Sequence, residues 1–94
     1  MTDEKNLTEE LVKGKKIGQI THFFNKIDVA VLELEGELKV GDTIVISGRG
    51  QEFEQYVDSM QVEHEQVVEA KAGDAVGLKV NQAVKEGDEV YLKG

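Results

Sequence analysis

Residues 71–80 read Lys-Ala-Gly-Asp-Ala-Val-Gly-Leu-Lys-Val, a glycine-aspartate turn that leads into an alternating strand. Val76, Leu78 and Val80 occupy every second position, which places their side chains on one face of a strand. This period predicts a β-strand at residues 75–80 that begins directly after a tight turn.

The turn half of this stretch is repeated. Lys-x-Gly-Asp occurs at residues 39–42, 71–74 and 85–88, each time just before an apolar segment. Glycine adopts a positive φ without steric cost, and aspartate accepts hydrogen bonds from backbone amides of a turn. We therefore predict structural turns, with ion-binding or phosphate-binding loops as the alternative interpretation. The residues concerned are Gly41, Asp42, Gly73, Asp74, Gly87 and Asp88.

The chain from residue 15 onward alternates between strand-like segments and turns. Besides residues 75–80, strand character is found at 15–24, 27–35, 43–47, 51–62 and 90–93. Gly18 marks a bulge or a close approach in the first strand, and residues 25–26 form a tight turn. Because no long helical pattern interrupts the strands, we predict an all-β fold, a six-stranded closed antiparallel-type β-barrel over residues 15–94, with a sandwich as the alternative.

The fourth of these segments, residues 51–62, is predicted to be one long strand. Strict alternation would place Phe53 and Val57 on one face and Tyr56, Met60 and Val62 on the other.

Residues 1–14 differ from the rest of the chain. Asn6 followed by Glu9 is a helix-start signal, and Leu7, Leu11 and Val12 form a short apolar stripe. So short a helix is marginal unless it is packed, so a polar arm is the favoured interpretation and a docked helix the alternative.

Composition limits the classes of protein that this chain can belong to. Its 94 residues suffice for one domain, and 39% hydrophobic residues is a globular proportion. No cysteine is present, no apolar run is long enough to span a bilayer, and the first residues lack a secretion signal, so we expect no membrane association and a cytoplasmic location. A net charge of −8 opposes general binding to phosphate backbones.

The sequence contains no catalytic constellation. No Gly-x-x-x-x-Gly-Lys-Ser/Thr motif is present, so we expect no GTP binding. Nothing in the sequence marks Ser47 or Ser59 as a nucleophile, since no histidine-acid pair is locally tied to either. We therefore predict no catalytic residues and no cofactor.

The two histidines suggest no metal site. His22 precedes two phenylalanines, which favours a partly buried packing role over contact with a ligand. His64 lies between Glu63 and Glu65, and in a strand it would point away from both carboxylates. We predict that no metal is bound.

Residues at turns and strand ends are the candidates for binding. One group surrounds the first turn, Arg49 is the only arginine, and two residues lie at the end of the fourth strand. Arginine near aromatic side chains is a recurrent recognition pair for bases and for proteins, and a solvated surface is the alternative. The candidates are His22, Phe24, Asn25, Lys26, Arg49, Gln61 and His64.

Three segments carry a resemblance to a known family. Residues 38–44, Leu-Lys-Val-Gly-Asp-Thr-Ile, are similar to its first hairpin. Residues 57–61 with 69–78, and then residues 84–90, match two further motifs in the same order and spacing. Residues 18–93 thus resemble the second, β-barrel domain of elongation factor Tu and related translational GTPases. The chain is also similar to small translation elongation factor-like proteins and to the barrel appended to some collagenase-like peptidases.

The resemblance implies binding without catalysis. In the elongation factor the barrel helps to hold the aminoacylated end of tRNA, and the acidic residue that meets the terminal adenosine corresponds to Gln61 here. Glutamine can still bond an adenine edge. We therefore expect a translation-factor-like binding domain that engages an RNA end, the ribosome or a protein in translation or RNA modification. The alternative is a protein-interaction adaptor that docks on a GTPase-type or peptidase-type partner.

Overall fold

The structure is a computed structural model that describes residues 14–48 and 51–93. The described residues contain β-strands and turns but no helix. The predicted arm or helix at residues 1–14 lies almost entirely outside this range. The strands are β1 (Lys15–Phe24), β2 (Val29–Leu34), β3 (Leu38–Lys39), β4 (Thr43–Gly48), β5 (Gln51–Tyr56), β6 (Met60–Val62), β7 (Glu65–Val67), β8 (Glu69–Ala70), β9 (Ala75–Lys79) and β10 (Glu89–Leu92).

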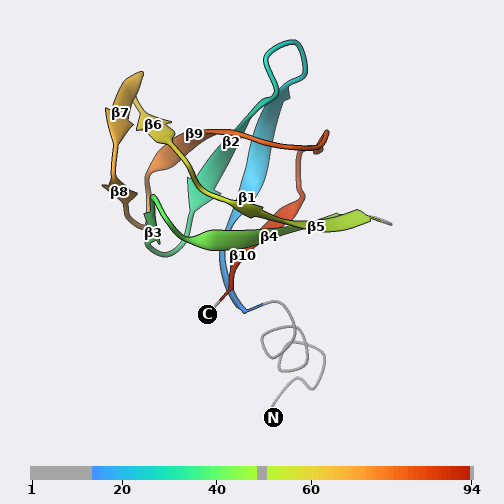
Figure 1. Cartoon of the computed structure of the whole chain (residues 1–94), viewed down its shortest axis with the longest axis horizontal. Helices are drawn as coiled ribbons and strands as arrows, with labels where there is room; N and C mark the ends of the chain where they lie inside the picture. The colour runs from blue at the N-terminus through green and yellow to red at the C-terminus, as the bar shows by residue number, and fades with distance from the viewer. Residues whose placement is uncertain (1–13, 49–50, 94) are drawn as a thin grey trace.

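Eight of these strands form one antiparallel sheet in the order β5-β4-β10-β1-β2-β9-β6-β7, and β3 pairs with β8. The sheet curls, so that β4 and β5 lie across β1 and β2 (Figure 1). β1 is 10 residues long and pairs with β10 on one side and with β2 on the other. A Cβ at Gly18 would lie 2.5 Å from the carbonyl oxygen of Glu33, so the predicted close approach in β1 is real.

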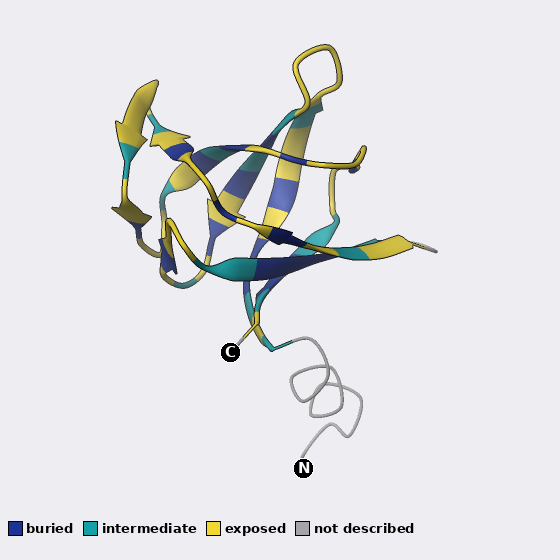
Figure 2. Cartoon of the chain, in the orientation of Figure 1, coloured by how far each residue is buried: buried dark blue, intermediate teal, exposed yellow. Residues whose placement is uncertain are grey.

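The inside of the curl is an aliphatic core. Burial alternates from residue to residue along β2 and β9 (Figure 2). Ala30, Leu32, Val76 and Leu78 are the buried members and belong to the core. Burial of such apolar surface is the main force that stabilises a small all-β domain. Residues between them in the sequence point to the opposite, outer side of the sheet.

The sheet keeps two ends, β5 and β7, which are not paired with each other in the described residues. The side chain of Gln55 crosses from β5 to the segment after β9: its Nε2 donates to the carbonyl oxygen of Lys79 (2.8 Å), and its Oε1 accepts from the backbone amide of Asn81 (2.9 Å). The all-β architecture is therefore established, and the fully closed barrel stays a prediction.

Each Lys-x-Gly-Asp segment forms the same turn. Gly41, Gly73 and Gly87 have φ angles of 100°, 94° and 93°. In each turn a carboxylate oxygen of the aspartate accepts from the backbone amide of the lysine, at 2.9 to 3.0 Å. The aspartate amide in turn donates to the lysine carbonyl oxygen, at 3.0 to 3.1 Å.

The prediction of six strands is wrong, because the described residues form ten. Three short strands, β3, β7 and β8, carry too few residues for alternation to reveal them. The predicted strand at 51–62 is two strands, since Val57 hydrogen-bonds Gly41 and Asp42 and the chain then changes partner from β4 to β9. Met60 therefore points into the core, whereas Tyr56 is exposed, and the shared face predicted for them does not exist.

Candidate functional site

The outer side of β1, β2, β9 and β6 brings together residues from four separate strands. His22 pairs with Val31, Val31 with Gly77, and Gly77 with Gln61, so these four residues form one row across the sheet. Phe24, Val29 and Lys79 form the neighbouring row. We name the surface made by His22, Phe24, Val29, Val31, Gly77, Gln61 and Lys79 the outer face.

The outer face has an apolar centre. Phe24 is 46% exposed, and Ile27 in the adjoining β1–β2 loop is 61% exposed. Val29 and Val31 are half-buried although they point away from the core. The ring of His22 meets that of Phe24 edge-on, with centroids 4.3 Å apart. Contiguous apolar side chains of this kind on a small domain are typical of an interaction surface.

Charged groups of opposite sign lie at the two ends of the outer face. Lys79 stands beside Val29, and Lys26 lies in the β1–β2 loop beyond it. At the other end Glu33 is paired with Ala75, one row beyond the row of Gly77. Lys79 thus marks a positive point near one end of the face and Glu33 a negative point at the other, while the hairpin loop carries both Lys26 and Asp28.

Glu86 flanks the face beside β1. Its Oε1 lies 3.5 Å from Nδ1 of His22, so the two side chains form an ion pair whenever the imidazole is protonated. His22 is exposed, with 51% of its side chain accessible, so the predicted packing role is wrong.

The sequence-predicted binding residues fall in three places. His22, Phe24 and Gln61 lie on the outer face, and Asn25 and Lys26 lie in the exposed β1–β2 loop next to it. His64 lies in the turn between β6 and β7, and Arg49 lies outside the described residues.

Sequence reasoning missed three residues of the outer face, Val29, Val31 and Gly77, and also the adjoining loop residue Ile27. The sequence of residues 27–35 predicts a strand buried on both sides, because the segment is rich in β-branched residues and largely apolar. In the structure β2 begins only at Val29, and Ile27 belongs to the loop. An apolar residue in a turn and a glycine in a strand are the signals that could have identified the surface.

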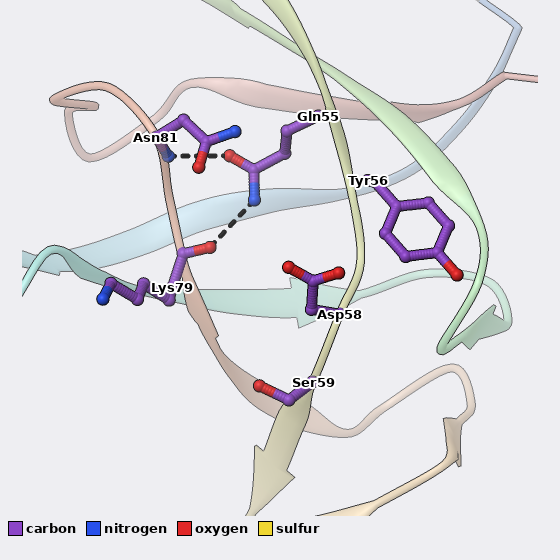
Figure 3. Close-up of a pocket in the computed structure, with 6 residues that line it drawn as sticks. All are labelled: Gln55, Tyr56, Asp58, Ser59, Lys79 and Asn81. Atoms are coloured by element: carbon purple, nitrogen blue, oxygen red, sulfur yellow. Dashed lines mark hydrogen bonds between the residues drawn. The ribbon is translucent and has the colours of Figure 1, made fainter.

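A separate polar cleft of about 160 Å³ lies between β5, β6 and β9 (Figure 3). The carboxylate of Asp58 and the hydroxyl of Ser59 point into it, whereas the side chain of Lys79 extends away (Figure 3). The amide of Gln55 is engaged in joining the two segments. No histidine is among the described residues that line this cleft.

A second cleft, of about 300 Å³, is lined by Glu37, Glu69, Ala70, Lys71 and Asp74. The Asp74 carboxylate is used in its own turn, where it accepts from Lys71. Within residues 14–48 and 51–93, no three histidine or carboxylate side chains are placed to hold a metal ion. The same part of the chain has no helix long and apolar enough to cross a membrane.

Comparison with known proteins agrees with this geometry. The family model for elongation factor Tu domain 2 matches residues 29–83, from β2 to the loop before β10. The chain belongs to the elongation factor Tu domain 2 family.

Two curated relatives that this chain matches have the names of peptidases. The chain is 47% identical over 78 residues to Uncharacterized protease MJ0090 of Methanocaldococcus jannaschii, covering 82% of this chain and 19% of the relative. It is 32% identical over 77 residues to a Collagenase of Porphyromonas gingivalis, covering 80% of this chain and 21% of the relative. The chain thus spans about a fifth of the length of these curated relatives.

A solved structure has the same fold. The C-terminal domain of a Geobacillus thermoleovorans protein assigned as a U32 peptidase superposes with a TM-score of 0.80. The superposition covers 85% of this chain and 93% of that domain, at 14% sequence identity. At this identity the likeness establishes the fold alone.

Proposed function

We propose that this chain is a non-catalytic protein-interaction domain that docks through its outer face on a peptidase-type partner. The observation that carries the proposal is the apolar strip of exposed Phe24 and Ile27 with half-buried Val29 and Val31, on a domain whose relatives bear peptidase names. Desolvation of such a strip against a partner supplies the free energy of association.

The location of the matched region supports a role beside a catalytic body. The curated relatives are about five times longer than the match, so most of their chain lies outside this domain. A solved domain of the same fold is described as C-terminal in its own protein. We propose that the curled sheet closes as a barrel through Gln55 and acts as a rigid scaffold for the outer face. The catalytic groups would then come from the partner.

The experiment supplies the domain and the partner separately. The Methanocaldococcus relative is produced without the 78 residues that this chain matches, and binding of this chain is measured by calorimetry. We expect a dissociation constant in the micromolar range or tighter, the range of specific protein complexes. A Phe24→Ser, Ile27→Ser double variant should lose binding, and Val68→Ser should retain it because Val68, although 76% exposed, lies outside the outer face. No binding by the unaltered chain would overturn the proposal.

Recognition of an RNA end is a second candidate. The observation that favours it is the presence of His22, Phe24 and Gln61 on one outer face, where the rings could stack on one base and the amide could bond another. The net charge of −8 opposes it. Filter binding to total tRNA across a salt series is the test, and no retention at low salt would remove this candidate. With either function, we propose a cytoplasmic location for the chain.

A further inference from the structure

Gly77 lies in the middle of β9, and neither its backbone nor its neighbours require a glycine. Its φ lies outside the positive region that favours glycine. A Cβ at this position would come no closer than 3.9 Å to the carbonyl oxygen of Gln61 and to Cγ1 of Val29, which is ordinary van der Waals contact.

Gly18, in β1, differs from Gly77. At Gly18 an added Cβ would collide with the backbone of Glu33, so the fold itself demands glycine there. Glycine within a strand weakens the strand, because it has more backbone entropy to lose and no side chain to pack. The fold therefore gives no reason for glycine at position 77, whereas close approach of another molecule does.

The surroundings of Gly77 are suited to an apolar guest. Val31 and Gln61 stand on either side of it in the same row, and half-buried Val29 lies diagonally across. With no side chain at Gly77, an incoming group can contact the strand backbone while it packs against these neighbours.

We infer that Gly77 is the seat for one apolar side chain of the protein partner, and that this side chain is the anchor of the interface. The inference rests on the proposed function and names the place and the chemistry of the contact. The partner segment carries an acidic group toward Lys79 and a basic group toward Glu33, because these two charges lie at opposite ends of the outer face.

A second copy of this chain fits the seat less well. If a two-fold axis passed through Gly77, two positions without side chains would face each other, and Val31 and His22 of both copies would hold the strands apart. The contact would then contain a void, which forfeits packing. A bulky side chain of a different protein would instead fill the space beside Gly77 and leave no void.

The test adds a side chain at the seat. Gly77→Val should bind the region-deleted Methanocaldococcus relative about tenfold more weakly or worse, since one well-packed anchor accounts for that much affinity. The thermal midpoint of the variant should stay the same or rise, because valine favours a strand. Gly77→Ala, whose Cβ fits without displacement, should bind with intermediate affinity and serves as the comparison if valine disturbs the fold.

Ala72→Val is the matched control, since Ala72 is exposed in a turn outside the outer face and the change also adds only apolar bulk. If both Gly77 variants bind as tightly as Ala72→Val, the seat is wrong while the proposed function stands. If the unaltered chain does not bind the relative, both proposals fail. If light scattering shows a dimer that Gly77→Val converts to a monomer, the occupant is a second copy and the inference is overturned.

Discussion

Nε2 of Gln55 donates a hydrogen bond of 2.8 Å to the carbonyl oxygen of Lys79, and this bond joins the end strand β5 to the chain that leaves β9. The same side chain accepts a bond of 2.9 Å from the amide of Asn81. Gln55 is 5% exposed and is the one buried polar side chain among the described residues. Here a side-chain amide, in place of a backbone ladder, joins β5 to the chain at the end of β9.

Replacing Gln55 by leucine should destabilise the domain by about 1–3 kcal/mol, the cost of leaving a buried donor and acceptor unpaired. Leucine is one bond shorter than glutamine, so the loss combines the two hydrogen bonds with a change of packing. Urea unfolding monitored by circular dichroism measures the difference.

Gln51 provides a control for this substitution. Its Nε2 makes the same kind of bond, to the carbonyl oxygen of Ala83 at 3.0 Å, but Gln51 is exposed. Gln51→Leu should therefore change the free energy of unfolding by less than about 0.5 kcal/mol, since water replaces the lost partner. Equal losses at both positions would contradict the role given to Gln55.

Gly87 has the conformational requirement that Gly77 lacks. Its φ is 93°, and an added Cβ would meet nothing within 4 Å, so any penalty comes from the backbone alone. Gly87→Ala should cost about 1–2 kcal/mol, as expected for an L-residue in a left-handed conformation. Gly77→Ala is the same chemical change and should leave the thermal midpoint unchanged or raise it. Thermal unfolding of the two variants side by side measures the contrast, and a fall at both positions would contradict it.

The sequence allowed prediction of the features that are local. β1 occupies residues 15–24 as predicted, and alternation along Val76 and Leu78 identifies the inward face of β9. The break at Val57 is different, because it depends on hydrogen bonds to Gly41 and Asp42, sixteen and fifteen residues earlier in the chain. No pattern within residues 51–62 records that the strand changes partners.

Assembly of the outer face was equally hidden from the sequence. Gln61 and His22 were candidates for separate reasons, but the two residues share one face only through the pairing of β1 with β2, of β2 with β9 and of β9 with β6. The exposure of Val29 and Val31 depends on whether another layer covers β2, which an apolar run alone does not specify.

Lys16 should make stability depend on alkaline pH. Burial opposes its charge, but the hydrogen bond to Glu89 and the charges of Glu35 and Glu89 outweigh burial and raise the pKa of Lys16 above 10.5. A raised pKa means that the folded state holds the proton more tightly than the unfolded state. The stabilisation is therefore complete below pH 10.5 and is lost as the pH rises through the pKa of the folded protein.

The measurement for Lys16 is the urea midpoint between about pH 9 and pH 11.5, the window around the ordinary lysine pKa. The Lys16→Met variant should fall less steeply than the unaltered chain, and the two curves should converge at the alkaline end. Other groups titrate in both proteins and cancel in the difference. Parallel curves would show that the ion pairs of Lys16 contribute nothing to stability.

The turn between β6 and β7 is formed by two residues that disfavour it. Glu63 and His64 have φ angles of 52° and 67°, and the flanking pair Val62 and Glu65 makes this a two-residue hairpin. Such turns prefer Asn-Gly, because both central residues adopt the left-handed region. The sequence prediction treated Glu63, His64 and Glu65 as strand, which is wrong for the first two.

Changing Glu63 and His64 together to Asn and Gly should stabilise the domain by about 1–2 kcal/mol. The reason is that Asn and Gly adopt the left-handed conformation of this turn at a lower cost than Glu and His. Glu37→Asn, at an exposed position without a positive φ, should change stability little and controls for loss of a carboxylate. Thermal unfolding measures the gain, and binding to the peptidase-type relative should be unaffected because neither residue belongs to the outer face. If the stabilised variant lost affinity for the relative, the strained turn would take part in binding, and His64 would be a binding residue.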